Sequence, residues 1–232
     1  MKSFIHYQLL SLFHSLKWMP PAMLYIAWIF TQYYYKNLPM ADSYSISAVV
    51  LYPIIVWNAM SVFNLEKGSE KLMLLSYMPK RQHFLYGKII VVFLAGAALA
   101  AISFFMPLLL GIFNEPLTIQ HIVHFMYGHV VFILFGIFTG GLFSATNMGG
   151  KKYSWSGSAF FVCAAIVSTK IMDVLPVALK WIVWSLPPVG TVTNIMKEGI
   201  TAHPGKNIWI AVYLIIGFMV LIKLFLTREK VN

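Results

Sequence analysis

Few side chains in this chain have the type and spacing that catalysis or ion binding requires. His121 and His124 are three residues apart, which places them on one face of a helix, as two ligands of a metal ion would be. No Cys, Asp or Glu joins them on that face, so the sequence predicts no metal site. His129 is the titratable residue deepest inside an apolar segment, and we interpret it as a helix-packing residue rather than a proton carrier.

The acidic residues exclude further chemistry. None of them lies near the middle of an apolar segment, where proton- or sodium-coupled transporters and proton relays need an ionisable group. No G-x-S-x-G nucleophile motif occurs. The nearest match to a nucleotide-binding loop is at 150–152, but Ala145 stands at its first glycine position and no Ser or Thr follows the lysine. The sequence therefore predicts neither an enzyme nor a secondary transporter, and any ATP that drives this protein must be hydrolysed on another chain.

The composition places the chain in a membrane. It is 59% hydrophobic and 10% charged, against roughly 25% charged residues in an average soluble domain. Its 232 residues have room for about six helices of ~20 residues. The long runs are apolar on every face, whereas a transmembrane barrel would alternate apolar and polar residues. We therefore predict an all-α polytopic membrane protein, in which the single Cys163 excludes an intrachain disulfide.

The apolar runs predict six transmembrane helices after a surface helix. Residues 1–17 are expected to lie in the membrane interface, because their apolar residues recur at helical spacing while polar residues occupy the opposite side. The apolar face of this segment comprises Ile5, Leu9, Leu12 and Leu16, with Phe13 at its edge. The expected spans are 19–35, 45–63, 89–113, 121–146, 155–172 and 207–226.

The stretch before the last span has a different character. Its apolar part, 175–186, is too short to cross a membrane and is broken by Pro187 and Pro188. We expect a re-entrant helix–turn–helix over 174–198. The alternative is that 175–194 is a seventh span, which would put the C-terminus outside, although Lys180 and both prolines would then lie within it.

The basic residues set the orientation. Of the Lys and Arg residues, twelve fall on the N-terminal side of the predicted membrane and five on the other, so the positive-inside rule places both termini in the cytoplasm. Because these residues are scattered over short loops, we attribute the net charge of +10 to membrane orientation and expect no nucleic-acid partner. We expect a multi-pass protein of the plasma membrane, and the scarcity of Arg relative to Lys favours a bacterial source.

One long polar segment, 64–88, interrupts the apolar spans. Ser69 is the predicted N-cap of a short helix over 69–78, with Glu70 in its first turn, where the helix dipole favours a carboxylate. Pro79 is expected to end this helix and begin the next. An apolar stripe is predicted along the short helix, and the basic residues after it are expected to face lipid phosphates or an acidic partner. The stripe is Leu72, Leu75 and either Tyr77 or Met78, and the basic residues are Lys80, Arg81 and Lys88.

Two interpretations of this segment remain open on the residues alone. It is either a solvated loop whose lysines fix the topology, or a helix that docks in a groove of a cytosolic protein. The pattern Glu66-x-Gly68-Ser69-Glu70-x-Leu72-x-x-Leu75-Ser76-x-x-Pro79-x-Arg81, followed by Tyr86-Gly87-Lys88, resembles the motif of ABC-2-type transporter permeases. Ser69 stands where threonine is common in that motif, which leaves the subfamily open.

The resemblance implies a single ABC-2-type transmembrane domain over 1–232 that pairs with a second copy or a paralogue. It further implies that a cytosolic ABC ATPase subunit binds the segment 64–88 as a coupling helix and carries ATP and Mg, so that this chain holds no cofactor. The residues that the resemblance assigns to coupling are Glu66, Gly68, Ser69, Glu70, Leu72, Leu75, Pro79, Arg81 and Lys88.

The function that follows is that of a permease subunit of an ATP-driven exporter. We expect an amphipathic or hydrophobic substrate, for example an antimicrobial or cytolytic peptide, because bulky apolar residues are abundant in the spans. The candidate substrate path is Phe104, Phe105, Phe132 and Phe135. The alternative is a membrane immunity or sensory protein that binds a peptide without transporting it. An ion channel would need a polar pore lining that these spans lack.

Small residues in two spans indicate close helix packing. Gly96 with Ala100, and Gly136 with Gly140, are each four residues apart, a spacing that lets helix backbones approach one another. They are expected either at the seam between two permease chains or between helices of one chain.

Overall fold

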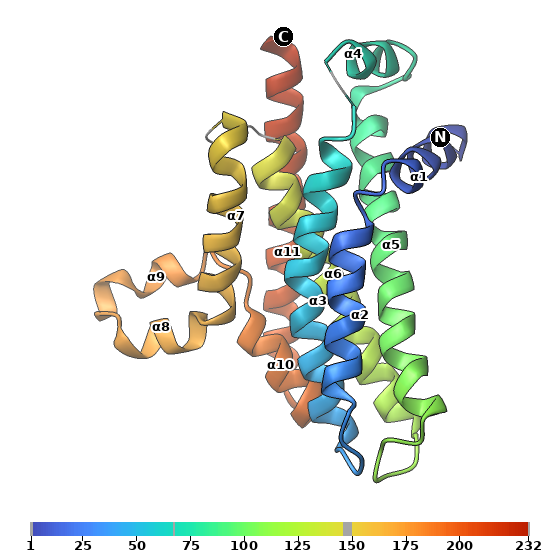
Figure 1. The fold of residues 1–232 in the computed structure, drawn as a ribbon. Helices are drawn as coiled ribbons and strands as arrows, with labels where there is room; N and C mark the ends of the chain where they lie inside the picture. Colours follow the sequence, from blue (N-terminus) through green and yellow to red (C-terminus); the bar gives the residue numbers. More distant parts are fainter. Residues whose placement is uncertain (1, 67, 146–149, 232) are drawn as a thin grey trace.

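The computed structural model describes residues 2–66, 68–145 and 150–231, which form helices joined by short connections (Figure 1). Apart from an isolated bridge between Leu38 and Phe113, these residues contain no β-structure. The elements are α1 (Lys2–His14), α2 (Met19–Gln32), α3 (Met40–Phe63), α4 (Gly68–Ser76), α5 (Arg81–Leu109), α6 (Ile119–Ala145), α7 (Gly150–Ile166), α8 (Ser168–Val174), η1 (Val177–Leu179), α9 (Lys180–Val183), α10 (Val189–Glu198), η2 (Ile200–Ala202) and α11 (Pro204–Val231).

The expectation of an all-α membrane protein with several spans is confirmed. Within the described residues, α3, α5, α6 and α11 are long and apolar enough to cross a membrane. The expected span 155–172 is bent by 71° between α7 and α8 and counts as a fifth if the pair is one span. The expected span 19–35 is not confirmed. Helix α2 has 14 residues and is therefore about 21 Å long, which is shorter than a ~30 Å hydrocarbon core.

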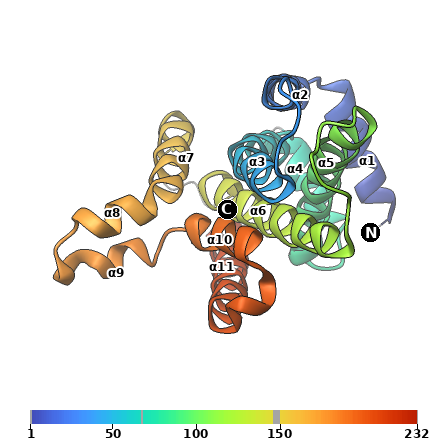
Figure 2. The ribbon, with the colours of Figure 1, turned by 90° about the horizontal axis from the view of Figure 1, so that it is seen from below.

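The core lies between α3 and α6, which run side by side through the centre of the bundle (Figures 1 and 2). The predicted small-residue pair of α6 makes this approach possible. A Cβ atom added to Gly136 would lie 2.6 Å from Ile55, and one added to Gly140 would lie 2.5 Å from Cβ of Ala59. Of the two uses expected for this pair, the structure shows packing within one chain.

The close contact at Gly140 makes its substitution costly. We expect Gly140→Ala to destabilise the bundle by about 1–3 kcal/mol, because the new methyl group would also meet the backbone carbonyl of Val56 at 2.8 Å and force α3 away. The thermal unfolding midpoint in detergent measures this effect. Gly205→Ala is the matched control, since a Cβ atom there has no neighbour within 4 Å. Equal midpoints for both variants would contradict the α3–α6 packing described above.

The predicted N-terminal helix is confirmed as α1, which is shorter than the expected 1–17 and packs against α5 (Figures 1 and 2). Its place in the membrane interface stays a prediction. Its buried face is shifted from the predicted one. The side chains that are buried are Phe4, Gln8 and Leu12, whereas Ile5 is half-buried. The predicted Leu16 is exposed and lies after the helix, with a φ of 54° that turns the chain toward α2. The face of α1 that packs on the protein is therefore formed by Phe4, Gln8 and Leu12, which are spaced four residues apart.

The segment 174–198 differs in detail from the predicted re-entrant hairpin. Between 175 and 194 the chain forms three short helical pieces rather than one continuous helix. Helices α8 and α9 project sideways from the bundle (Figures 1 and 2). Helix α10 packs against α3 and α6 through Val192 and Ile195, and the Lys197 ammonium lies 2.7 Å from the Asp42 carboxylate. Pro187 and Pro188 separate α9 from α10, because a proline lacks the backbone N–H that a continuing helix needs.

The buried His129 has the surroundings of a packing residue. Its Nδ1 lies 2.9 Å from the backbone oxygen of Phe125, and its Nε2 lies 3.2 and 3.3 Å from the hydroxyls of Ser47 and Ser103. These contacts link α6 to α3 and α5.

His121 has an acidic neighbour that the sequence analysis did not predict. At the end of the bundle near the 33–39 turn, the Glu115 carboxylate lies 4.0 Å from the His121 ring.

Candidate partner-docking site around α4

Helix α4 stands outside the bundle, at the end where both ends of the described chain lie (Figure 1). It begins at Gly68 and ends at Ser76, slightly before the predicted 69–78. The prediction that Ser69 is the N-cap is wrong, because this residue is already inside the helix. The position of Glu70 in the first turn is confirmed. Gly68 has no neighbour within 4 Å of an added Cβ atom, so it faces open space.

The connection from α4 to α5 is longer than predicted. Pro79 lies in a turn between the two helices and does not occupy the first position of the second, which begins at Arg81 with Lys80 as its extended N-cap. Pro79 and Arg81 are both exposed. The turn separates α4 from the long span, so α4 forms a distinct arm rather than an extension of α5.

The apolar residues of α4 and the turn after it divide into two faces. Leu74, Leu75 and Met78 pack inward against the cluster that contains Phe84 and Phe225. Leu72, Met73 and Tyr77 point outward, with 60%, 56% and 81% of their surface exposed. The predicted stripe that joined Leu72 with Leu75 is therefore wrong. We call Leu72, Met73 and Tyr77 the outer face of α4.

A buried ion pair joins the two ends of the segment 64–88. The Lys88 ammonium, with 1% of its side chain exposed, is paired with the Glu66 carboxylate and donates to the backbone oxygen of Val62 at 2.7 Å. It also lies 5.0 Å from the centre of the Phe84 ring. The expectation that Lys88 faces lipid or an acidic partner is wrong, because an ammonium so buried needs its counter-ion inside the protein.

Helix α1 adds two hydrogen bonds to this segment. Gln8 donates from Nε2 to the Glu66 carboxylate, and the Tyr7 hydroxyl donates to Glu70 at 2.5 Å. The ring of Phe4 packs against that of Phe84. Sequence reasoning missed these residues of α1. The available signal was Gln8, a polar residue placed midway between the apolar Phe4 and Leu12 at a spacing of four.

The hydrogen bond from Tyr7 makes the contact between α1 and α4 sensitive to alkaline pH. Its donation to Glu70 raises the pKa of the Tyr7 phenol above the ordinary 10.0, with burial and the neighbouring negative charges acting in the same direction. Because the folded-state pKa is raised, the stabilising contribution is complete below pH 10 and is lost as the pH rises through the raised pKa. We therefore expect the protection of the α4 amides, measured relative to their base-catalysed intrinsic exchange rate, to fall as the pH rises through this raised pKa.

The variant Tyr7→Phe tests this assignment. It lacks the hydroxyl, so exchange in α4 should already be faster at neutral pH and should lose its additional change above pH 10. His14→Ala is the control, because His14 is an exposed residue of α1 that bonds within its own helix. An unchanged exchange rate in Tyr7→Phe would show that the bond does not hold α4.

The four residues of the candidate substrate path occupy two places. The rings of Phe104 and Phe105 are in contact, as are those of Phe132 and Phe135. Phe132 and Phe135 are fully buried in the core of the chain, whereas Phe105 is exposed on the outside. The structure therefore brings them together as two pairs and not as one lining.

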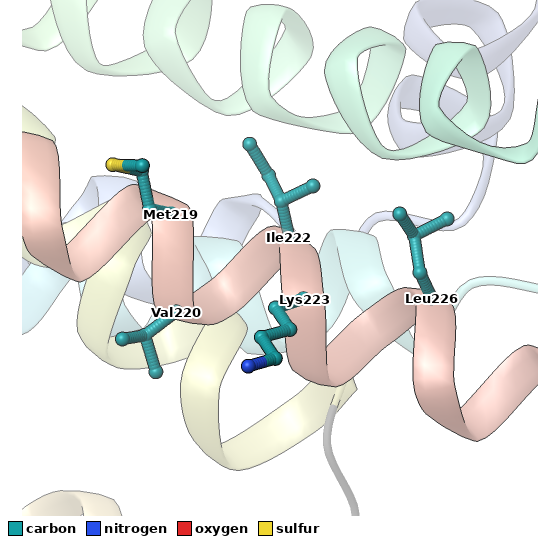
Figure 3. A pocket seen from close by; sticks show the side chains of 5 residues that line it. All are labelled: Met219, Val220, Ile222, Lys223 and Leu226. Atoms are coloured by element: carbon teal, nitrogen blue, oxygen red, sulfur yellow. The ribbon is translucent and has the colours of Figure 1, made fainter.

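An open apolar depression of about 440 Å³ lies on the C-terminal half of α11. This half is at the end of the bundle where α4 lies. Figure 3 shows Met219, Ile222 and Leu226 on one side of this helix, with Val220 and Lys223 on the other. A lysine at the rim of an apolar helix surface keeps its charged end in water while its stem covers apolar atoms. These residues form an exposed apolar surface on α11.

Comparisons with known protein families, with curated proteins and with solved structures found no match for this chain.

Proposed function

We propose that this protein is the permease subunit of an ATP-driven exporter and that α4 is its contact with a separate cytosolic ATPase. The observation that carries the proposal is the outer face of α4. Leu72, Met73 and Tyr77 are large apolar side chains, grouped and exposed on a short arm at the end of the bundle. Exposed apolar groups on a polar segment are typical of protein contacts.

The inner side of α4 supports a mechanical role. The Glu66–Lys88 pair connects the end of α3 to α5, and the bonds from Tyr7 and Gln8 connect α1 to the same segment. A force on α4 would therefore move the ends of three helices together. In this proposal, ATP binding closes the ATPase dimer, displaces α4 and opens a path between two permease chains for an amphipathic or hydrophobic substrate.

The proposal includes six crossings with both chain ends in the cytoplasm of a bacterial cell. The sixth crossing would be α2, which runs alongside α3 (Figure 1). Because its 14 residues are too few to span the hydrocarbon core alone, the residues that flank it would have to complete the crossing. An even number of crossings agrees with the position of both chain ends beside α4. A cysteine placed in α4 should then react with a membrane-impermeant maleimide only after the cells are opened.

Photocrosslinking tests the partnership and separates it from the alternative of a peptide-binding immunity or sensory protein. A photoreactive benzoylphenylalanine at Met73 should form an adduct with a co-expressed ATPase encoded beside this chain. The control position is Tyr35, which is 70% exposed and belongs to the turn at the opposite end. The partnership would be refuted by a Met73 probe that yields no ATPase adduct, or by equal adducts from both positions.

A further inference from the structure

A cavity of about 350 Å³ lies between α1, α2, α3 and α5, on the outside of the bundle. Its volume is in the range of small-molecule sites, and its walls are almost wholly apolar. Leu94, Ala98 and Ile102 follow one another along α5 at a spacing of four, and all are exposed. Eight residues of helix rise about 12 Å, so this row forms an elongated wall that suits an extended chain.

Two polar atoms in the residues that line this cavity lack partners. Asn58 has 2% of its surface exposed, and its Oδ1 atom accepts no hydrogen bond from the described residues. The indole Nε1 of Trp18 is likewise buried and donates to none of them. Leaving a buried polar atom without a hydrogen-bond partner is energetically unfavourable. Neither atom has accessible surface of its own, so a ligand pairs with them only once the Asn58 amide and the Trp18 indole turn toward the cavity. One acceptor and one donor are then available to it.

The depth of these atoms points to the class of ligand. Asn58 is five residues before the end of α3, and therefore about 8 Å inside the bundle from the end that carries α4. Trp18 immediately precedes α2 at the same end. In a bilayer this is the boundary between headgroups and hydrocarbon, where Trp is enriched. A lipid has its glycerol and ester groups at this depth and its acyl chain below it.

We propose that this cavity binds one single-chain glycerolipid from the leaflet on the side of α1. Its acyl chain lies along Leu94, Ala98 and Ile102. Its free glycerol hydroxyl donates to Oδ1 of Asn58, and its ester carbonyl accepts from Nε1 of Trp18. A free hydroxyl on the lipid's glycerol backbone is required at this depth, because the ester oxygens there only accept and the headgroup hydroxyls lie farther out. The exposed Lys17, next to Trp18, favours an anionic headgroup. This binding goes beyond the proposed export function and requires no ATPase.

The acyl-chain part is tested by native mass spectrometry of the purified protein with palmitoyl lysophosphatidylglycerol, whose middle glycerol hydroxyl is free. The wild type should retain one lipid, and Ala98→Phe should lose it because the new ring occupies the cavity. Ala97→Phe is the matched control, since Ala97 is an exposed neighbour on α5 outside the lining. Equal retention by Ala98→Phe and wild type would overturn the proposal.

The polar part is tested on the wild-type protein, which avoids any folding defect. The same lipid with its middle hydroxyl methylated should bind about tenfold more weakly, because Oδ1 of Asn58 then remains unpaired. In Asn58→Leu the two lipids should bind equally. Equal affinity of the wild type for both lipids would overturn the assignment of the hydroxyl. Tighter binding of dipalmitoyl phosphatidylglycerol, which has two acyl chains and no free middle hydroxyl, would overturn it as well.

Discussion

Replacing Glu66 with leucine should destabilise the α4 end of the protein by about 3–5 kcal/mol, the cost typical of leaving a buried charge without its counter-ion. Lys88 is 1% exposed and would keep its bond to the Val62 backbone oxygen and its contact with the Phe84 ring. Neither neutralises an ammonium. Gln8 would lose the acceptor of its Nε2 as well. The thermal unfolding midpoint and hydrogen exchange of α4 in detergent would measure the effect.

The double variant Glu66→Leu with Lys88→Met separates lost charge balance from lost packing. Replacing both members of a buried pair by apolar residues of similar volume is often neutral or stabilising. We expect the double variant to recover most of the loss, with a remainder of about 1–3 kcal/mol from the unpaired amide of Gln8. If Glu66→Leu alone were as stable as the wild type, Lys88 would reach water and the ion pair would not hold the arm.

The sequence predicted the helical class well because membrane spans follow from average hydropathy. The runs that became α3, α5, α6 and α11 are long enough that no tertiary contact could change their assignment. The run that became α2 ended early, since the chain leaves the helix at Tyr33 and turns to meet the 110–114 connection, where Asn37 donates to Ile112. Hydropathy does not detect such a turn, because tyrosines suit both a span and its edge.

The candidate site was predicted in place but not in orientation. The polar composition of 64–88 was sufficient to locate an arm outside the helix bundle. Helical spacing alone could not decide which apolar residues of α4 face inward, because α4 has apolar side chains on both sides. That choice depends on Phe84 and Phe225, which belong to α5 and α11 and come near α4 only in the folded chain.

The wrong prediction for Lys88 has the same cause, a contact that forms only in the folded chain. In the sequence it follows two basic residues and resembles a third member of that group. It lies two turns inside α5, however, and the turn after α3 brings Glu66 against it. A partner 22 residues away in the chain gives no periodic signal. The motif that suggested coupling therefore contains residues of two kinds, since Glu66 and Lys88 brace the arm from within and Leu72 lies on its surface.

If α4 docks on an ATPase as proposed, Leu72→Asp should abolish that assembly while leaving the fold intact. The side chain is 60% exposed in the isolated chain, so a carboxylate at its end remains in water until a partner covers it. In an assembled interface the same carboxylate would be buried without a counter-ion. A loss of 2–4 kcal/mol is typical of a central apolar contact, which corresponds to about 30- to 1,000-fold in affinity. Co-purification of the tagged protein with the proposed ATPase measures it.

Two matched variants serve as controls for Leu72→Asp. Ile119→Asp introduces the same charge at a residue that is 80% exposed but belongs to the start of α6, at the opposite end, and should leave assembly unchanged. Leu75→Asp places the charge on the inner side of α4 and should lower thermal stability before it affects the partner. Assembly that survives Leu72→Asp, together with full stability of Leu75→Asp, would mean that α4 neither docks on a partner nor packs as described. The outer face would then be an ordinary solvated surface, and the exporter proposal would lose the observation on which it rests.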